Sequence, residues 1–376
     1  MSNGETPRTD YYENCIFLRE ARRYASAETA RTCQRILSGA KYVSVDLEAI
    51  KRFVAGNYER EFNCPSWKEE FIFPESDEEF VEYLGVCLAS NFAFTNFESP
   101  YGKYCVEFPE EKLHFGSNAL GVALMRAISE GRPIFNFKYL ADICPEEVSW
   151  IFRSSGENAS IPLPIQRFRQ MRSFGQTMIL LGYKNMADFL SEHDFFAFSH
   201  SLGGVIYEGF VDCLAGKFSS FYDTVKSKRG LVVPFNKRAN LLALMYQSRA
   251  TQVGSKLPPL RDARHIIPPA DYQVPRALEA MGLIKYSDPL KNKIFERKIL
   301  SYGSQAEIEI RAASVVVMCA LLEGMNRERN SCSPPKKEIT MCELDPFMWF
   351  TGRTIKTDPP IGRQVLPHHL TKTTAY

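Results

Sequence analysis

The longest apolar stretch of the sequence covers residues 312–322, where Ser314 is the only polar residue. A helix that spans a bilayer needs about 20 consecutive apolar residues. This stretch is much shorter, so it predicts a helix that is buried inside a folded protein and does not cross a membrane. The rest of the chain therefore has to fold around it.

Length and composition are compatible with a globular fold around such a helix. The chain has 376 residues, 45% of which are hydrophobic. A chain of this size can bury one large core or two lobes. Because the apolar residues recur mostly at helical spacing, we expect a mostly α-helical fold.

The charges of the chain nearly cancel. Lys and Arg number 46 against 44 Asp and Glu, which leaves a formal net charge of +2. Proteins that bind duplex nucleic acid through its phosphates carry a clear basic excess, so we expect no direct binding of a duplex. Residues 1–14 are polar and lack the apolar stretch of a secretory signal, so we expect a cytoplasmic protein, with the nucleus as an alternative.

Cysteine and histidine are not arranged as metal ligands in the sequence. None of the ten cysteines belongs to a C-x-x-C pair, and the six histidines form no H-E-x-x-H motif. His368 and His369 lie in a Pro-rich tail that starts at Lys356, and we expect this tail to extend over the surface with its histidines solvated. We predict neither a metal ion nor another cofactor.

One β-element is expected, a hairpin formed by residues 104–108 and 112–115. Just before it, residues 91–97 alternate aromatic residues with smaller ones. This alternation is compatible with a short strand or a pocket wall, although aromatic packing in the core is the more common role.

The segment His200-Ser201-Leu202-Gly203-Gly204 resembles the nucleophile elbow of lipases. In that elbow a glycine stands two residues before the serine, because the turn brings strand and helix too close for a side chain. Ser199 occupies this position here, so we reject a serine hydrolase and expect a helix to start at Gly203.

Lys237 lies in the first turn of a helix that is expected to start near Asn236. Leu241 and Met245 follow one and two turns later on the same face, so the lysine points toward the apolar side of the helix. A lysine in this place extends its amine to water or meets an anion, and the unpaired amides of a helix start favour the anion. Taken alone, the sequence leaves a solvated lysine as an equal alternative.

Asp271 precedes a helix that is expected to start near Pro275, and an aspartate in this place most often caps the helix. Lys237 and Asp271 together, however, resemble the lysine and aspartate of helix-hairpin-helix DNA glycosylases, which lie in a G-x-K-T-A-N helix start and a V-D-x-x-V-x-R segment. The match covers Lys237, Ala239, Asn240, Asp271, Val274, Arg276, Gly282 and Leu283. The Gly-rich hairpin of those enzymes is absent before the lysine, which disfavours DNA as the substrate.

A second resemblance covers most of the chain. Its most specific segments are ADYQVPR at 270–276, GLIKYSD at 282–288, LSYG at 300–303 and EIEIR at 307–311. These segments are similar to the queuosine salvage protein family, whose members are N-glycosylases that release the base queuine from queuosine 5′-monophosphate. The similarity extends to residues 235–239, residues 91–94, Ile161, Pro162, Arg167, Arg169, Asp345 and Trp349.

The resemblance implies a helical architecture like that of the helix-hairpin-helix DNA glycosylases, with a small β-hairpin and no cofactor. It divides the chain into an N-terminal region with the aromatic segment and hairpin (1–116), a helical catalytic region (117–330), and a C-terminal helix and extended tail that complete the pocket (331–376). The implied reaction hydrolyses the N-glycosidic bond of queuosine 5′-monophosphate and releases queuine for salvage into tRNA modification. The implied partner is this small nucleotide.

The resemblance also implies which groups react. Queuine is a 7-deazaguanine, in which a carbon replaces the ring nitrogen that usually takes up a proton when a purine leaves, so catalysis has to act on the sugar. A carboxylate below the anomeric carbon stabilises an oxocarbenium-like transition state or attacks it, and Asp271 is the candidate. Lys237 is the candidate for holding the 5′-phosphate or for tuning the carboxylate, and the sequence does not choose between these roles.

The base of queuosine carries a cationic amine arm. Phe94 and Trp349 are candidates for stacking on the ring, and Asp345 is a candidate for binding the amine or the ring N–H edge. Capping of a last helix, expected from Asp345-Pro346 through Trp349, is an equal alternative for this aspartate. Asn91, Tyr272 and Arg276 complete the candidate substrate-binding residues.

Three positions depart from the family pattern. A tryptophan, a carboxylate or amide, and in animal members a histidine are expected where Thr95, Phe350 and Leu47 stand. These departures keep open a queuine-binding or nucleotide-binding protein with weakened catalysis, although the presence of both Lys237 and Asp271 argues against it. A DNA or RNA base glycosylase is a further alternative, which the nearly neutral charge and the missing hairpin disfavour.

Overall fold

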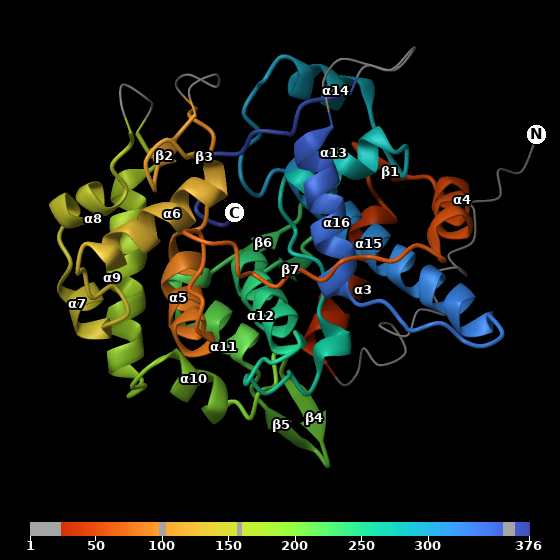
Figure 1. Ribbon diagram of the computed structural model, residues 1–376. Coiled ribbons are helices and arrows are strands. Elements are labelled where there is room, and N and C mark those ends of the chain that lie inside the picture. The colour runs from red at the N-terminus through yellow and green to blue at the C-terminus, as the bar shows by residue number, and fades with distance from the viewer. Residues whose placement is uncertain (1–23, 98–102, 156–159, 356–364) are drawn as a thin grey trace, which may run out of the picture.

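The computed structural model describes residues 24–97, 103–155, 160–355 and 365–376 (Figure 1). The polar start at 1–14, the beginning of the 1–116 region and the beginning of the tail at Lys356 lie outside the described residues.

Helices dominate the described residues, which confirms the expected mostly α-helical fold (Figure 1). In chain order they are α3 (Ala25–Leu37), α4 (Leu47–Asn57), α5 (Asp77–Ser90), α6 (Gly116–Ser129), α7 (Phe137–Asp142), α8 (Pro145–Ile151), α9 (Pro164–Leu180), α10 (Met186–Glu192), α11 (Phe210–Lys217), α12 (Lys237–Ala250), α13 (Gln273–Ala280), α14 (Asp288–Phe295), α15 (Gln305–Ser331) and α16 (Met341–Thr354). Short 3-10 turns lie at Ser219–Phe221 and Ala263–His265.

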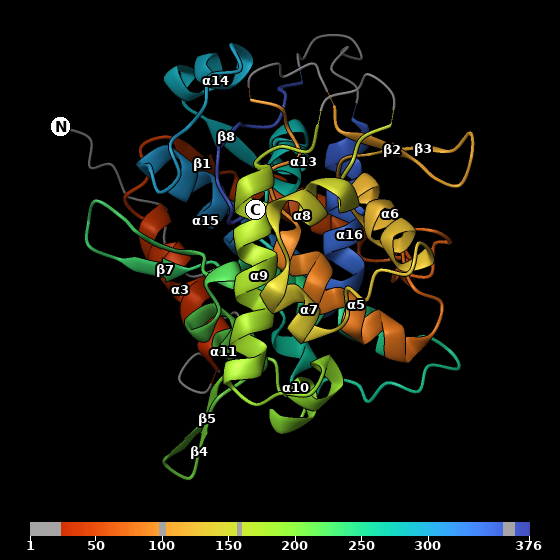
Figure 2. The ribbon, with the colours of Figure 1, turned by 90° about the vertical axis from the view of Figure 1, so that its left-hand side faces the viewer.

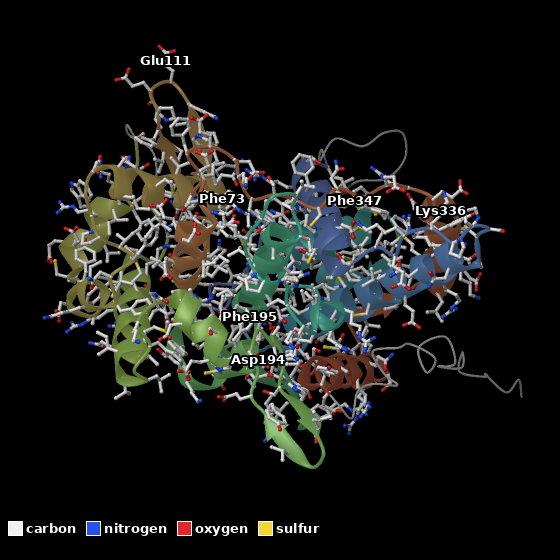
Figure 3. All side chains as sticks on the ribbon, turned by 60° about the horizontal axis from the view of Figure 1, so that its bottom comes forward. Phe73, Glu111, Asp194, Phe195, Lys336 and Phe347 are labelled. Atoms are coloured by element: carbon white, nitrogen blue, oxygen red, sulfur yellow. The ribbon has the colours of Figure 1, made fainter. Side chains whose placement is uncertain are left out.

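The strands of the described residues form short antiparallel pairs. They are β1 (Val43–Val45) with β8 (Ile284–Tyr286), β2 (Cys105–Glu107) with β3 (Leu113–Phe115), β4 (His200–Leu202) with β5 (Val205–Tyr207), and β6 (Thr224–Lys226) with β7 (Val232–Pro234). The β2–β3 pair is the expected hairpin, and Glu111 lies at its protruding turn (Figure 3). The expectation of a single β-element is wrong, because strands this short do not show the alternation by which a sequence reveals a strand.

The segment that resembles a nucleophile elbow is a hairpin turn. Gly203 and Gly204 connect β4 to β5 with φ angles of 59° and 83°. Two-residue hairpin turns of this kind require positive φ at both positions, which glycine adopts without strain. The expected helix start at Gly203 is therefore wrong.

Helix α15 contains the long apolar stretch and lies at the centre of the packing. Residues 312–322 are all buried, and α15 packs against α3, α4, α13 and α16 (Figure 1). On another side of the molecule α7 packs along α9 (Figure 2). One cluster of buried hydrophobic residues extends from Ala30 to Met348, so the three regions of the chain share a core. No helix among the described residues is long and apolar enough to cross a bilayer.

Helix α16 begins earlier than expected. Its start at Met341 is fixed by a capping box, in which Thr340 and Glu343 each bond the other's backbone N–H. Pro346 lies inside the helix, although a helix start at Asp345-Pro346 is expected from the sequence. The proline removes one helical bond, but the capping box fixes the earlier start and α16 packs against α13. Asp345 is therefore not a helix cap.

Residues 365–376 are mostly buried or half-buried, with Lys372 as the exposed exception. His369 is 4% exposed and Tyr376 is 3% exposed. The backbone N–H of Ala93 donates to the carbonyl of Tyr376 at 3.1 Å, and that of Leu300 donates to the carbonyl of Leu370 at 2.7 Å. The expectation of a surface tail with solvated histidines is therefore wrong, because backbone pairing with distant segments holds this part of the chain inside.

Candidate active site

Lys237 is the first residue of α12 and is buried. The residue before it, Asn236, has a left-handed backbone with a φ of 47°. The backbone N–H of Lys237 donates to Asp223 Oδ2 at 2.9 Å, and the whole residue is only 6% exposed. Burial lowers the pKa of Lys237, and the carboxylates of Asp271 and Asp345 oppose this effect. The alternative of a solvated lysine is therefore wrong.

Asp271 caps α13 and also faces Lys237. Its Oδ1 accepts hydrogen bonds from the backbone N–H groups of Gln273 at 2.8 Å and Val274 at 3.2 Å. Burial raises the pKa of Asp271, while Lys237, the two N–H groups and the side chain of Trp349 oppose this effect. Capping and a role in chemistry are therefore compatible, because the cap uses one carboxylate oxygen.

Asp345 lies within α16 and points into the same site. It is 5% exposed, and its Oδ1 is buried without a hydrogen-bond partner. Burial and the charge of Asp271 raise the pKa of Asp345 well above its usual range, and Lys237 opposes them. A buried polar atom without a partner is costly in a folded protein, so it commonly marks a place for a ligand or a proton.

A close helix contact brings α16 to the start of α13. A Cβ atom added to Gly352 would lie 2.1 Å from the carbonyl oxygen of Gln273. Only glycine therefore allows this approach, which places Asp345 and Trp349 beside Asp271. The structure thus brings together four of the residues that the sequence nominated, from three helix starts or faces: Lys237, Asp271, Asp345 and Trp349.

The remaining aromatic candidates lie around the tail. The ring of Tyr272 lies 4.8 Å from the ring of His368 and 6.4 Å from that of Tyr376, between ring centroids. Phe94 is partly buried, and the guanidinium of Arg167 lies 5.4 Å from its ring. Asn91 is buried directly after α5. Tyr272 thus adjoins the buried acids, whereas Phe94 and Asn91 belong to the neighbouring segment 91–97.

Arg276 is engaged in holding the backbone. Its guanidinium donates to the carbonyls of Leu366 at 3.0 Å, Gly352 at 2.8 Å and Ile355 at 2.9 Å. These bonds clamp the end of α16 and the tail to α13. The geometry therefore favours a structural task for Arg276 over direct contact with a substrate.

The sequence profile of the family described as "Queuosine salvage protein" matches residues 72–376. The chain belongs to this family. Curated relatives named "Queuosine 5'-phosphate N-glycosylase/hydrolase" are similar over most of their length. The relative from Sphaerobacter thermophilus is 28% identical over 347 residues, which are 92% of this chain and 96% of the relative. The relative from Bos taurus is 27% identical over 324 residues, with 84% and 88% covered.

A more distant relative of the same name comes from Schizosaccharomyces pombe and is 24% identical over 292 residues, which are 75% of this chain and 78% of the relative. The resemblance to the queuosine salvage family is therefore confirmed. Every candidate site residue lies inside the matched range of residues 72–376.

Two arginines of this queuosine salvage family member support the site, although neither is assigned a role from the sequence. Arg167 donates to the carbonyl of Ala93 at 2.9 Å and also to the carbonyls of Ser90 and Phe92. Arg238 donates to the carbonyls of Leu88 at 3.0 Å and Ala89 at 2.6 Å. Together they bind the backbone at the end of α5, where Asn91 and Phe94 begin the aromatic segment. No local motif marks an arginine that binds carbonyls far away in the sequence.

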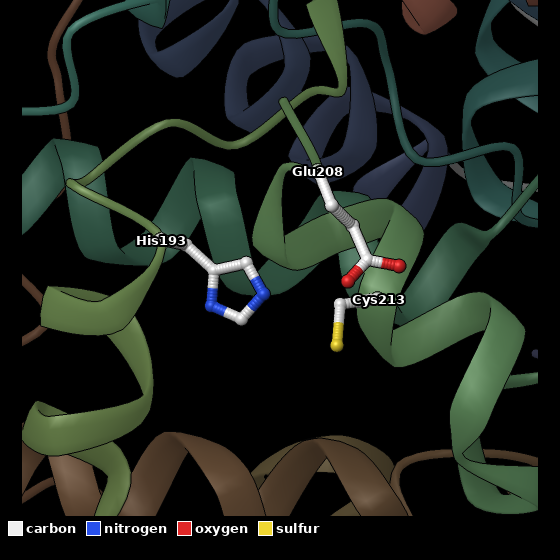
Figure 4. Close-up of side chains that lie close together, drawn as sticks. All are labelled: His193, Glu208 and Cys213. Atoms are coloured by element: carbon white, nitrogen blue, oxygen red, sulfur yellow. The ribbon is translucent and has the colours of Figure 1, made fainter. Parts of the chain in front are cut away.

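A separate cluster between α10 and α11 contains His193, Glu208 and Cys213 (Figure 4). Their candidate ligand atoms lie within 4.8 Å of one another. Lys217 already supplies a cation there, because its amine donates to Glu208 Oε2 at 2.6 Å. Burial raises the pKa of the Cys213 thiol to about 11, which keeps it protonated near neutral pH. The geometry therefore favours an ion pair over a metal centre at this cluster.

Proposed function

We propose that the protein hydrolyses the N-glycosidic bond of queuosine 5′-monophosphate and releases queuine. The observation that carries the proposal is the burial of Lys237, Asp271 and Asp345 in one place, in a chain similar over nearly its whole length to relatives with that name. Desolvated charges that lack full compensation are typical of active sites. The protein is accordingly an N-glycosidase that acts on a small nucleotide.

In this proposal Asp271 acts on the sugar. Its two backbone N–H donors hold Oδ1 in place, which leaves the other oxygen for the anomeric carbon. A carboxylate fixed in a desolvated site stabilises positive charge as it develops, or attacks the carbon to form a glycosyl intermediate. The same donors and Lys237 favour the ionised form that either role requires.

Lys237 tunes the carboxylates in this proposal. Its backbone N–H is already accepted by Asp223, so the start of α12 offers less to a phosphate than a free helix start does. Its side chain acts instead on the pKa of both Asp271 and Asp345. Of the two roles that the sequence left open, the geometry therefore favours tuning over phosphate binding.

Asp345 receives the cationic or N–H-bearing part of the base. Burial and the charge of Asp271 raise its pKa and so favour its protonated form in the free protein, and an incoming cation favours its ionised form. Trp349 and Tyr272 supply aromatic surface beside it. Asn91 and Phe94 contribute from the neighbouring segment 91–97. The tail at 365–376 completes this wall, in keeping with the proposed division into regions 1–116, 117–330 and 331–376.

We also propose that the architecture is akin to that of helix-hairpin-helix glycosylases. The support is the placement of Lys237 at the start of one helix and Asp271 before a later one. The short β6–β7 pair precedes α12 here, where those enzymes have a glycine-rich hairpin.

The surroundings of two departures from the family pattern argue against the alternative of a binding protein with weakened catalysis. Phe350 is 61% exposed on α16, so its side chain points away from the buried acids. Thr95 Oγ1 lies 3.4 Å from His368 Nε2, so an imidazole of the tail adjoins Thr95. The tail thus supplies an aromatic ring beside the position where a tryptophan is expected.

The test is direct. Purified protein is incubated with queuosine 5′-monophosphate, and free queuine is measured by mass spectrometry, with guanosine 5′-monophosphate as the control substrate. Release of queuine, unchanged after dialysis against a strong chelator, is expected. Cleavage of neither nucleotide, together with tight binding of queuine, would favour the binding-protein alternative. Loss of turnover on chelation would contradict the prediction that no metal takes part.

A further inference from the structure

Asp223 and Arg311 form a buried ion pair behind the candidate active site. Arg311 donates from Nη1 to Asp223 Oδ1 at 2.9 Å and from Nη2 to Oδ2 at 2.5 Å, so the contact is bidentate. Arg311 is 0% exposed and Asp223 is 1% exposed. Burial opposes the charge of Arg311, but Asp223 and Glu307 outweigh it and raise the pKa of the guanidinium. The guanidinium therefore remains charged.

Each partner holds one of the two segments that carry the reacting groups. Asp223 accepts the backbone N–H of Lys237 at 2.9 Å through Oδ2 and that of Asn236 at 3.3 Å through its carbonyl. Arg311 Nε donates to the carbonyl of Ala270 at 2.9 Å, directly before Asp271. The ion pair therefore connects the start of α12 to the segment that carries Asp271.

We infer that the Asp223–Arg311 pair is a positioning device that sets the separation of Lys237 and Asp271. Neither member of the pair is placed at the reacting atoms, since both bind the backbone next to the proposed reacting residues. The inference rests on the proposed function, because it concerns the two groups proposed to react. The backbone of Asn236 supports the inference. A left-handed residue at a helix start is strained, and the bonds that Asp223 accepts from the N–H groups of Asn236 and Lys237 hold it in this conformation.

The shape of the guanidinium explains why an arginine occupies this position. Nη1 and Nη2 donate to the carboxylate of Asp223, while Nε donates to the carbonyl of Ala270. A lysine amine cannot reproduce this fixed, planar arrangement of donors. The guanidinium carbon also lies 4.1 Å from the ring centroid of Phe235 and 4.5 Å from that of Tyr376. The flat group thus contacts two aromatic rings in addition to its hydrogen-bond partners.

The test uses Arg311→Lys and Asp223→Asn in the full-length protein. A misplacement of about 1 Å in a reacting group costs about 10²-fold in rate, so we expect a fall of this size in single-turnover cleavage of queuosine 5′-monophosphate. Affinity for queuine should stay within about threefold, because ground-state contacts of the base are not touched. The acid limb of the pH–rate profile should move, since the effect of Lys237 on the pKa of Asp271 depends on their separation.

Helix α12 offers a matched control at its C-terminal end. Arg249 Nε donates to Asp77 Oδ1 at 2.8 Å, in a second buried ion pair of the same residue types. Asp77→Asn should lower the melting temperature and leave both the single-turnover rate and the pH–rate profile of the folded protein unchanged.

Each outcome is decisive. Folded Arg311→Lys protein that cleaves at the wild-type rate overturns the inference and leaves the proposed function intact. An equal loss of rate in Asp77→Asn also overturns it, because the effect would then be general destabilisation.

If neither variant of the pair folds, Tyr302→Phe removes one hydrogen bond to Asp223, which measures 3.1 Å, and an unchanged rate overturns the inference. The expected loss there is about threefold, the worth of one hydrogen bond. Wild-type protein that releases no queuine overturns the proposed function and this inference together.

Discussion

The two ends of helix α12 each bury a basic residue, but they treat its charge differently. At the C-terminal end Arg249 donates to Asp77 at 2.8 Å, to the carbonyl of Trp67 at 2.7 Å and to the carbonyls of Pro74 and Glu75. At the N-terminal end the amine of Lys237 is buried near the carboxylates of Asp271 and Asp345, and Oδ1 of Asp345 has no hydrogen-bond partner.

The difference separates a structural charge from a functional one. A buried charge with all its donors satisfied holds segments together, and removing its partner destabilises the fold. Buried charges without full compensation make no such contribution and are retained for a ligand or a reaction. Substitution of Asp77 should therefore lower the stability of the protein, whereas substitution of Asp271 should lower its activity.

The largest effect is expected on stability, at the structural end. Asp77→Ala leaves Arg249 buried without its carboxylate, so the free energy of unfolding should fall by about 3–5 kcal/mol. Urea unfolding followed by circular dichroism measures this loss. Turnover per folded molecule should remain at the wild-type level. A loss below about 1 kcal/mol would place this pair among weak surface-type pairs and remove the contrast.

The next effect is expected on activity, at the other end. Asn caps helices about as well as Asp, so Asp271→Asn should unfold within about 1 kcal/mol of the wild type. Loss of the charge should reduce single-turnover cleavage at least ~10²-fold, which equals roughly 2.7 kcal/mol. A folded variant that cleaves within a few-fold of the wild type would leave Asp271 with a capping role alone.

The pH dependence of stability should have opposite signs at the two ends. The pKa of Asp345 is raised, so its protonated form favours the native state, and that contribution is lost as the pH rises through the folded-state pKa. Asp345→Asn should therefore gain stability relative to the wild type above about pH 4, where the unfolded chain releases the proton.

Asp77 should behave in the opposite way. Burial alone would raise its pKa, but bonds from Arg249, Lys256 and Ser255 lower it below 3.8. Its contribution is present above the unfolded-state pKa and is lost as the pH falls through the folded-state value. Urea unfolding of the wild type, Asp345→Asn and Asp77→Asn at several pH values between 3 and 8 measures both trends, and parallel curves would contradict the comparison.

The smallest effect is expected at Phe350. Its side chain is 61% exposed, so Phe350→Gln should change the free energy of unfolding by less than about 0.5 kcal/mol. Turnover should stay within about twofold of the wild type, because the residue points away from the buried acids. A strong loss of turnover would show that this face of α16 contacts the substrate.

Several elements could be predicted from the sequence because their causes are local. The sequence pattern predicts a helix from about Asp77 to Ser90, and α5 has these bounds in the structure, where Ser76 caps it through a bond from the N–H of Glu79. Asp46 likewise caps α4, and the β2–β3 hairpin follows its turn residues. Caps, turns and periodic apolar faces involve neighbours within a few residues, so a sequence records them.

The candidate site could be predicted only in part from such local patterns. The motifs around Lys237 and Asp271 nominated both residues, and their roles stay predictions. Arg276 was nominated with them, but in the structure it binds the carbonyls of Leu366, Gly352 and Ile355. A motif identifies a residue type at a position and does not reveal which distant backbone atoms will use its donors.

By itself the sequence determined the mostly helical fold, the buried helix around residues 312–322 and the membership of the queuosine salvage family. Only the tertiary structure decided that Asp345 is a buried acid with an unpartnered oxygen, that His369 and Tyr376 are buried, and that Asp223 and Arg311 connect the two segments of the site. The physical reason is the separation along the chain of the residues that interact. Helix formation depends on contacts between near neighbours, whereas the cost of a buried charge depends on which partners distant segments bring to it.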